Sequence, residues 1–528
     1  MSIYEEGGIP TLVALLEAEN AGPHVNATRS LWHLSANADN RLAVSREGGL
    51  SPLVKLLIDG SELAQESAAA ALESLTTDCP ENQLAKYTIE AIQPLVNLLG
   101  SDNEHTQDYA VGALLNISAP NETNRNGVVR PLVALLEVRN ATAQMKAAQA
   151  LMLMASKSAV NRISIAEAGA IPPLVQLLGD GRNATTPQIR AAAVLSDLAR
   201  MGENKQAVVA AGGVPPLVKM LSSLSPDAQI YASGALWHLA ANTEAARQIT
   251  SLEGIFPLVA LLSSASPLAA KQAAGALWHL EASADNKGAI VKAGGIPPLV
   301  KLLRSDSADT QEAAAMVLSD LARSVAGNKA ITMAGGIASL VALLLNGSAM
   351  GKKHAACALW GLTSGTTGYG SSKGADVDSN MSIIVDAGAV PTLVELISTS
   401  SSAPVGGAPT AGAAVGYAVA TLNNLSRNTA ARSQMLAEGV VDRLVAAIAL
   451  NGPETWLRSQ GVEVLLNLGV NVEGPDAAKL NTEQLLQRAQ AEQGKKGGAG
   501  TLGRFEKFHA AGGEKKPQQF STRPLQGA

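Results

Sequence analysis

The sequence is poor in the residues that mark several common classes of protein. Only two cysteines, Cys79 and Cys357, occur in 528 residues, which is too few for a disulfide framework and typical of a reducing compartment. The first residues carry no basic segment followed by an apolar one, and no run of about 18 apolar residues occurs. We therefore expect no secretory signal and no membrane span. We expect a cytoplasmic protein, with the nucleus and the cilium left open.

Charge and aromatic residues are also scarce. The net charge is −5, so no strong basic field favours nucleic acid as a partner. Hydrophobic residues make up 47% of the chain but aromatic residues only 3%, a balance that suits close-packed helices built from Ala, Leu and Val. Because 528 residues are too many for one compact core, we expect several domains or an array of repeats.

Motifs for catalysis are missing as well. The stretch GAGTLG at 498–503 fits a dinucleotide-binding pattern and GSSKG at 370–374 fits a nucleophile-elbow pattern. Neither lies between a strand and a helix, as those motifs require. No HExxH, Walker loop or Cys-x-x-Cys pair occurs. We therefore expect no enzymatic activity and no cofactor.

What the chain does contain is a repeat. A ten-residue pattern with a central Leu-Val pair recurs, and the pairs that begin at 217, 258, 299 and 340 are 41 residues apart. Eleven copies can be aligned, and they begin at residues 7, 48, 90, 127, 169, 212, 253, 294, 335, 388 and 438. A period of this length is typical of a solenoid, in which neighbouring units bury each other's apolar faces.

Each unit predicts three helices. An Asn such as Asn204, Asn286 or Asn328 is placed to cap a short first helix, and a Gly pair then ends that helix. Pro stands near the start of the second, Leu-Val helix, where its missing N–H costs nothing. After a polar turn, a longer third helix rich in Ala and Leu completes the unit. In the fourth unit the first helix is nearly missing, so we expect a local change of superhelical twist there.

This pattern resembles the armadillo-repeat family over residues 1–470. The resemblance implies an all-α fold, a right-handed solenoid of about eleven three-helix repeats of ~41 residues. It also implies that the third helices line a concave groove that binds an extended segment of a partner protein. We assign residues 1–470 to the array and 471–528 to a C-terminal tail.

Four of the five tryptophans occupy one position of the third helix. Trp237 and Trp278 stand in the nearly identical stretches GALWHLAAN and GALWHLEAS. On a helix of 100° per residue, Trp237 and His238 lie opposite the stripe of Ala232, Leu236 and Leu239. We interpret these tryptophans as anchors in the groove. The alternative interpretation is that each tryptophan lies flat against the third helix of the next repeat and is structural.

The resemblance implies which polar residues would hold a partner. Armadillo third helices often carry an Asn before their last Leu, and this Asn binds the backbone of the bound peptide. The expected groove residues are Trp32, His33, Asn116, Asp197, Trp237, His238, Trp278, His279, Asp320, Trp360, Asn424 and Asn467. The aligned residue of the fourth unit is Leu153, which predicts a gap in the row of polar residues.

Two further roles for the polar residues were considered. Asp197, His238, His279 and Asp320 lie on four successive third helices. Packed helices are about 8–10 Å apart and zinc requires ligands at about 2.0–2.3 Å, so no metal site is predicted. Histidine titrates near neutral pH, so His238 and His279 suggest the hypothesis that partner binding depends on pH.

Three segments depart from the repeat. Residues 364–380 and 398–412 are rich in Gly and Ser and predict flexible loops. In the tail, residues 481–493 predict one short helix, and the Gly/Lys-rich end from 494 predicts disorder. Phe505, Phe508 and Phe520 stand in this end and suggest a short binding motif, which could reach the chain's own groove.

The sequence therefore predicts a non-catalytic scaffold or adaptor that binds other proteins, neither nucleic acid nor membrane. Three alternatives stay open. They are a structural component of cilia or the cytoskeleton, the substrate-recognition part of a ubiquitin ligase, and a nuclear import adaptor. Import adaptors carry Trp one turn before the Asn position. That place is held here by residues such as Arg29, Gly112 and Gly234.

Overall fold

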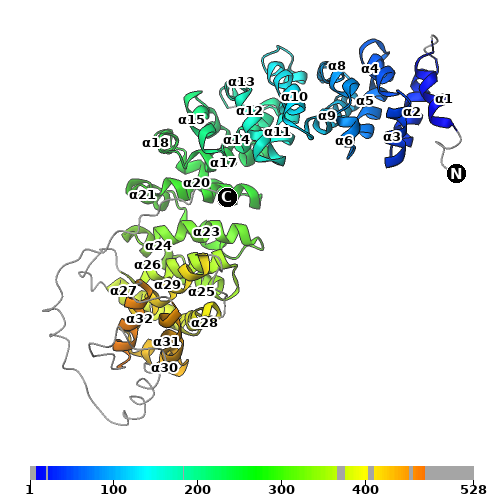
Figure 1. The fold of residues 1–528 in the computed structure, drawn as a ribbon. Helices are drawn as coiled ribbons and strands as arrows, with labels where there is room; N and C mark the ends of the chain where they lie inside the picture. The colour runs from blue at the N-terminus through cyan, green and yellow to red at the C-terminus, as the bar shows by residue number, and fades with distance from the viewer. Residues whose placement is uncertain are drawn as a thin grey trace.

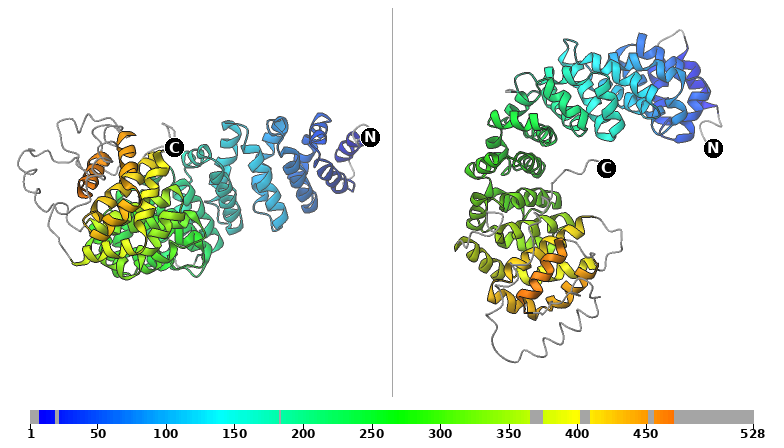
Figure 2. Two further views of the ribbon diagram at one scale, coloured as in Figure 1. Left: turned by 90° about the horizontal axis from the view of Figure 1, so that it is seen from below. Right: turned by 60° about the vertical axis from the view of Figure 1, so that its left-hand side comes forward.

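The computed structural model describes residues 7–18, 22–181, 184–364, 375–401, 409–450 and 456–469. These residues form α-helices without strands, stacked into one long curved array (Figures 1 and 2). One continuous apolar core runs through the stack, from Ile9 in the first repeat to Leu465 in the eleventh. The all-α solenoid that the period predicts is confirmed.

The helices fall into the three predicted classes. The first helices of the repeats are α3 (Ala38–Arg46), α6 (Pro80–Gln83) with α7 (Lys86–Glu90), α12 (Ala159–Glu167), α15 (Gly202–Ala210), α18 (Thr243–Ser251), α21 (Ala284–Lys292), α24 (Val325–Met333), α27 (Ala375–Asp386) and α30 (Thr429–Ala437). The second helices are α1 (Gly8–Leu16), α4 (Leu50–Asp59), α8 (Ile92–Leu98), α13 (Ile171–Leu178), α16 (Val214–Met220), α19 (Ile255–Leu261), α22 (Ile296–Leu302), α25 (Gly336–Asn346), α28 (Ala389–Ser401) and α31 (Val440–Leu450).

The third helices are the longest and pack on one another along the array. They are α2 (His24–Leu34), α5 (Glu62–Thr76), α9 (Glu104–Ser118), α11 (Ala141–Lys157), α14 (Thr186–Leu198), α17 (Pro226–Leu239), α20 (Pro267–Leu280), α23 (Ala308–Leu321), α26 (Ala349–Thr363), α29 (Pro409–Leu425) and α32 (Trp456–Asn467). In Figure 1, α14, α17, α20 and α23 follow the inner side of the curve, and α15, α18 and α21 follow its outer side.

The Gly pair acts as predicted. Gly212 ends α15 in the left-handed region with φ = 79°, and the N–H of Gly213 donates to the carbonyl oxygen of Val208 at 2.9 Å. Only Gly adopts such a φ without strain. In the seventh repeat Glu253 takes the same place with φ = 57°.

The prediction that an Asn caps each first helix at its N-terminus was wrong for the residues named. Helix α21 begins after Ser283, and Asn286 lies inside it. The Nδ2 of Asn286 donates to the carbonyl oxygen of Leu280, the last residue of α20, at 2.8 Å. Asn204 and Asn328 bond the end of their preceding third helix in the same way. A buried Asn there satisfies carbonyl groups that a helix end leaves unpaired.

The fourth repeat differs from the others, as its short sequence predicts. Its first and second helices are fused into α10 (Glu122–Leu135), which contains Pro131 inside the helix. Helix α10 packs between α9 and α11, and these two third helices touch each other less than other successive pairs do. The change of twist stays a prediction.

The predicted loops 364–380 and 398–412 were too wide. Helix α27 begins at Ala375, α28 continues to Ser401 and α29 begins at Pro409. The start of α27 has a physical reason: Asn380 repeats the role of Asn286, and its Nδ2 donates to the carbonyl oxygen of Leu362 at 3.2 Å. The remaining parts of both segments lie outside the described residues. So does the tail 471–528, with the predicted helix 481–493 and Phe505, Phe508 and Phe520.

Among the described residues, no single helix is long and apolar enough to cross a membrane. Helix α24 with α25, and part of α27 with α28, reach the required composition only as pairs bent by 85° and 75°.

Candidate functional site

The predicted orientation of the Trp-His pair is found in the structure. Ala232, Leu236 and Leu239 of α17 are fully buried in the core. Trp237 and His238 are half-buried and turn away from that stripe. The same holds for Trp278 and His279 on α20, because the two helices share their spacing. The helices that carry these pairs, α17 and α20, follow the inner side of the curved array (Figure 1). We call the row formed by Trp237, His238 and the residues aligned with them on the other third helices the inner row; it includes Trp32, His33, Glu73, Asn116, Asp197, Trp278, His279, Asp320, Trp360, Asn424 and Asn467.

Each central tryptophan stacks on the histidine that follows it. The ring centroids of Trp237 and His238 are 5.1 Å apart with an interplanar angle of 16°. Those of Trp278 and His279 are 4.6 Å apart and tilted by 48°. Trp237 and His238 therefore lie nearly parallel, whereas Trp278 and His279 meet at an angle.

Trp237 is also packed against the next repeat, as the structural interpretation of the tryptophans expects. A Cβ on Gly275 of α20 would stand 2.5 Å from its indole ring. The Nζ of Lys271, on the same helix, lies 6.0 Å from the ring centroid. Gly275 therefore makes room for the tryptophan of the preceding helix and not for Trp278 of its own helix. Trp237 thus packs on α20 and remains partly exposed, and its role as an anchor stays a prediction.

The tryptophans near the ends of the array have different neighbours. Trp32 meets Tyr109, two repeats further along, edge to face at a centroid distance of 5.4 Å. Trp360 meets Trp456, also two repeats further along, at 6.0 Å. Tyr417, in the repeat between them, lies 5.7 Å from Trp360. Aromatic pairs at these distances stabilise beyond the area they bury.

The three Asn residues of the inner row hold neighbouring repeats together. The Nδ2 of Asn116 donates to the carbonyl oxygen of Glu73 at 3.0 Å. That of Asn424 donates to Thr363 Oγ1 at 3.0 Å, and that of Asn467 to Ser426 Oγ at 2.8 Å. In each case the amide N–H group is committed to the preceding third helix. The Oδ1 atoms accept no hydrogen bond from the described residues, so they are the groups left for a partner's backbone N–H.

Both aspartates of the inner row are paired within their own helix end. Asp197 Oδ1 lies 3.7 Å from a terminal nitrogen of Arg200, and Asp320 forms an ion pair with Arg323. His33 is exposed. The aspartates with local partners therefore stand on either side of the two central Trp-His pairs.

Cations surround the central histidines. Burial, and then the charges of Arg200, Lys205, His279 and Arg162 in that order, lower the pKa of His238 to about 4. Burial, followed by Lys205, lowers the pKa of His279 to about 4. Both imidazoles are therefore neutral at physiological pH, which argues against the hypothesis that they make the free groove sensitive to neutral pH. We call Arg162, Arg200 and Lys205 the basic cluster.

Carboxylates surround the N-terminal aromatic pair. Glu73 of α5 occupies the position that Trp holds in the central repeats, and a Cβ on Gly112 of α9 would collide with its carboxyl group. Burial, and then the carboxylates of Glu66, Glu73 and Asp108, raise the pKa of the Tyr109 hydroxyl. Burial, and then Asp108, raise the pKa of Glu73. We call Glu66, Glu73 and Asp108 the acidic cluster.

The sequence pattern alone does not indicate the two clusters or one buried carboxyl group. Aligning the position of Trp237 and Trp278 in every repeat would have shown that Glu73 occupies it in the second repeat. Lys205 and Arg162 each directly follow the Asn of a first helix. Because that Asn bonds the end of the preceding third helix, the residue after it lies beside the inner row. Glu281 follows the last Leu of α20, is only 1% exposed, and neither of its oxygens has a hydrogen-bond partner.

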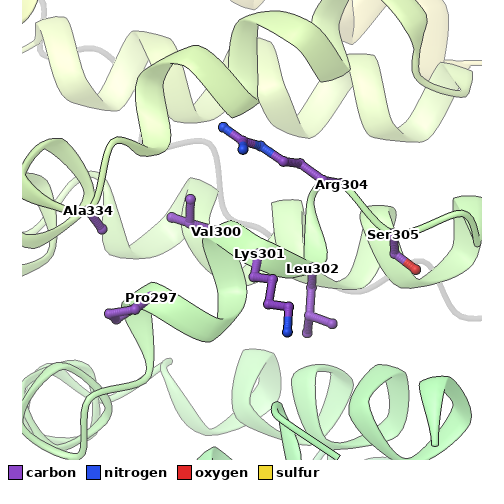
Figure 3. Close-up of a pocket in the computed structure, with 7 residues that line it drawn as sticks. All are labelled: Pro297, Val300, Lys301, Leu302, Arg304, Ser305 and Ala334. Atoms are coloured by element: carbon purple, nitrogen blue, oxygen red, sulfur yellow. The ribbon is translucent and has the colours of Figure 1, made fainter. Parts of the chain in front are cut away.

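The described residues contain no group of three or more His, Cys, Asp or Glu that could hold a metal ion. A hollow of about 510 Å³ opens beside α22 and the turn after it. Its lining includes Lys301, Arg304 and Ser305, and Figure 3 shows Arg304 and Lys301 pointing to opposite sides. The Nε of Arg304 donates to Ser339 Oγ at 3.0 Å. This hollow lies on second helices, away from the inner row, and its lining carries no carboxyl group or histidine.

Comparisons with known proteins agree with this architecture. A family model described as the armadillo-repeat region of plant U-box proteins matches residues 11–280. A model of the armadillo/β-catenin-like repeat matches residues 283–323. The chain belongs to the armadillo-repeat family.

Solved structures of engineered proteins are similar to the chain. A crystal structure of one, from the Northeast Structural Genomics Consortium, is 31% identical with a TM-score of 0.62. It covers 79% of this chain and 98% of its own. A second engineered protein from the same consortium is 36% identical over 45% of this chain and 96% of its own, with a TM-score of 0.41. No curated protein matches the chain significantly.

Proposed function

We propose that the protein is a non-catalytic scaffold or adaptor that binds an extended segment of a partner protein along the inner row. Armadillo repeats as a family mediate protein–protein interaction, and this chain belongs to that family. The observation that carries the proposal is the two neighbouring Trp-His pairs on α17 and α20, in each of which the rings contact each other and stay partly exposed. Aromatic residues of this kind are the usual anchors of protein interfaces.

Two further features support an extended partner. The free Oδ1 atoms of Asn116, Asn424 and Asn467 accept no hydrogen bond within the described residues, and a partner's backbone N–H groups would satisfy them. They occur at both ends of the inner row, on either side of the Trp-His surfaces. A segment that reached all of them would be extended and long, and its affinity would come from a few anchors.

The test is a pull-down from the native cell lysate with the full chain as bait, read by mass spectrometry. The variant is the double substitution Trp278→Ala/His279→Ala, which leaves the inter-repeat contact of Trp237 in place. The matched control is Phe256→Ala/Met333→Ala, since these side chains are 56% and 79% exposed on other helices. Loss of specific partners from the first variant alone supports the proposal. Unchanged partner lists, with equal melting temperatures, contradict it.

A second function is favoured by one observation. The model that matches residues 11–280 is described for plant U-box proteins, and a ubiquitin ligase needs a surface that binds its substrate. In that case the inner row would select the substrate, and the catalytic step would belong to a U-box. A ubiquitin-transfer assay with the native full-length protein separates this function from that of a scaffold. Cytoskeletal attachment and nuclear import have no observation of this kind in their favour.

A further inference from the structure

The inner row carries opposite charges at two places. In the first three repeats, the acidic cluster of Glu66, Glu73 and Asp108 surrounds Tyr109. Lys146 pairs with one of these carboxylates: its Nζ lies 2.7 Å from Asp108 Oδ1. The Nδ2 of Asn103 donates to Glu66 at 2.8 Å. The Glu73 carboxylate has neither an ion pair nor a hydrogen bond among the described residues, so this end of the row has excess negative charge.

Glu73 is also placed beside aromatic rings. Trp32 and Tyr109 meet at 5.4 Å, on the repeats before and after the helix that carries Glu73. A cation that contacts both an aromatic face and a carboxylate is stabilised by both. This combination fits the ammonium of a lysine or the guanidinium of an arginine.

The central repeats carry the opposite charge. Arg162, Arg200 and Lys205 all act on His238, and Asp197 is the carboxylate that Arg162 and Arg200 act on. The Nε of Arg162 is buried without a hydrogen-bond partner. The ammonium of Lys205 has no ion pair or hydrogen bond with any described residue. Three cations facing one carboxylate leave excess positive charge beside the Trp-His surfaces.

The distance between the two clusters can be related to chain length. Glu73 lies in the second repeat and His238 in the sixth, so four steps between successive third helices separate them, of which the step from α9 to α11 is less closely packed. Each step is about 8–10 Å, which gives about 32–40 Å. An extended segment rises about 3.3 Å per residue and covers this span with about 10–12 residues.

We propose that the inner row selects partner segments with two charged ends: a basic side chain that binds at Glu73 beside the Trp32–Tyr109 ring pair, and acidic side chains about 10–12 residues away that bind at Lys205 and Arg200. This inference rests on the proposed function, because it names the chemistry of the segment that the groove would hold. The occupant is a segment of another protein, and charge complementarity is the argument for it.

The experiment is a selection of random 24-residue peptides displayed on phage against the full chain. The parallel target is the Trp278→Ala/His279→Ala variant. We expect enriched peptides to carry Lys or Arg and a Glu/Asp pair at a spacing of 10–12 residues. Enriched peptides that require Trp278 and His279 but show no such charge pattern would overturn the inference and leave the proposed function standing. No enrichment over the variant would contradict both.

Charge substitutions then test each end. For a selected peptide, Glu73→Gln and Lys205→Gln are each expected to weaken binding about five- to tenfold at low salt, as fluorescence anisotropy measures, and the loss should shrink at high salt. Glu395→Gln and Lys219→Gln make the same charge changes on exposed positions of second helices and should leave affinity unchanged. Equal effects from both pairs of variants would overturn the inference, as would displacement of the peptide by a 20-nucleotide single-stranded DNA.

Discussion

The tryptophans near the ends of the array and those in its middle occupy one position of the repeat but have different surroundings. Trp32 and Trp360 contact aromatic rings two repeats away, Tyr109 and Trp456. Trp237 and Trp278 stack on the histidine next to them, among charged and titratable groups. Trp32 stacks on His33 as well, and Trp237 also packs on the next repeat, so the difference lies in the aromatic contact two repeats away, which the structure shows for Trp32 and Trp360.

This difference separates stability from recognition. Rings that contact across repeats strengthen the interfaces on which a solenoid depends, since each repeat is stabilised mainly by its neighbours. Rings that stack on their own helix add less to those interfaces and leave a surface for a partner. Substitutions should therefore have large effects on stability near the ends and smaller ones in the middle.

The largest expected effect is that of Trp360→Ala. It removes the ring contacts with Tyr417 and Trp456, so we expect the free energy of unfolding of the last three repeats to fall by about 3 kcal/mol. Trp278→Ala should cost about 1–2 kcal/mol, because its stacking partner lies on its own helix. Hydrogen exchange read by mass spectrometry, repeat by repeat, measures both. Equal losses of protection in the two variants would remove the distinction between ends and middle.

Gly275→Ala tests the contact between the indole ring of Trp237 and helix α20. The added Cβ would stand 2.5 Å from the indole, so the ring or the helix must move, at a cost of about 1–3 kcal/mol. Gly288→Ala is the matched control, since nothing lies within 4 Å of a Cβ there and Ala favours a helix. Thermal melts should show destabilisation for the first variant and no loss for the second. A stabilised Gly275→Ala protein would mean that Trp237 does not depend on α20.

Structural features that follow from the repeat period can be predicted from the sequence, and features that do not follow from it cannot. The helices, the core stripe of Leu236 and Leu239 and the outward Trp237 all follow from the 41-residue period. The role of Asn286 does not, because a cap on its own helix and a cap on the preceding helix produce the same spacing. Contacts between Trp360 and Trp456 also escape the pattern, since they join residues that occupy different positions of their repeats.

The position of the charged clusters cannot be predicted from the repeat pattern for another reason. Glu73 stands in the tryptophan column, but its meaning depends on Glu66 and Asp108, which reach the same place from two helices. Only the stacking of repeats brings such residues together. A single sequence shows the column but not its neighbours.

Glu281→Ala tests the middle of the array. Burial, and then the nearby Asp320 carboxyl, raise the pKa of Glu281 well above its usual value, and both its oxygens lack hydrogen-bond partners. A raised pKa means that the stability it contributes is present below pH 4.5 and is lost as pH rises through the folded value. We therefore expect the variant to gain about 1–2 kcal/mol at pH 8 and less at pH 5. A gain independent of pH, or a loss at pH 8, would show that Glu281 has a partner.

The histidines of the middle predict the opposite dependence. Their pKa values of about 4 lie below the ordinary 6.5, so the unfolded chain binds protons first and stability falls as pH drops from about 6.5 to 4. Each histidine should account for about 1–2 kcal/mol over this window. His354 of α26, with a pKa of about 4, contributes in the same range. The double variant His238→Gln/His279→Gln isolates the central pair, and its repeats should keep more of their hydrogen-exchange protection at pH 5. Equal acid sensitivity in the variant and the native chain would contradict the lowered pKa values.

The smallest expected effect is on binding near neutral pH. Both central histidines are neutral from pH 6 to pH 8, so a partner that leaves their surroundings unchanged should bind with constant affinity over that range. An acidic segment at Lys205 would raise both pKa values, but a rise of about two units is needed before either histidine is half protonated at pH 6, and Lys205 and Arg200 stay beside them to oppose it. We therefore expect less than a twofold change in affinity between pH 8 and pH 6, as isothermal titration measures. A tenfold gain at pH 6 that the His238→Gln/His279→Gln variant loses would show that the partner's carboxylates lie directly on the imidazoles rather than on the basic cluster.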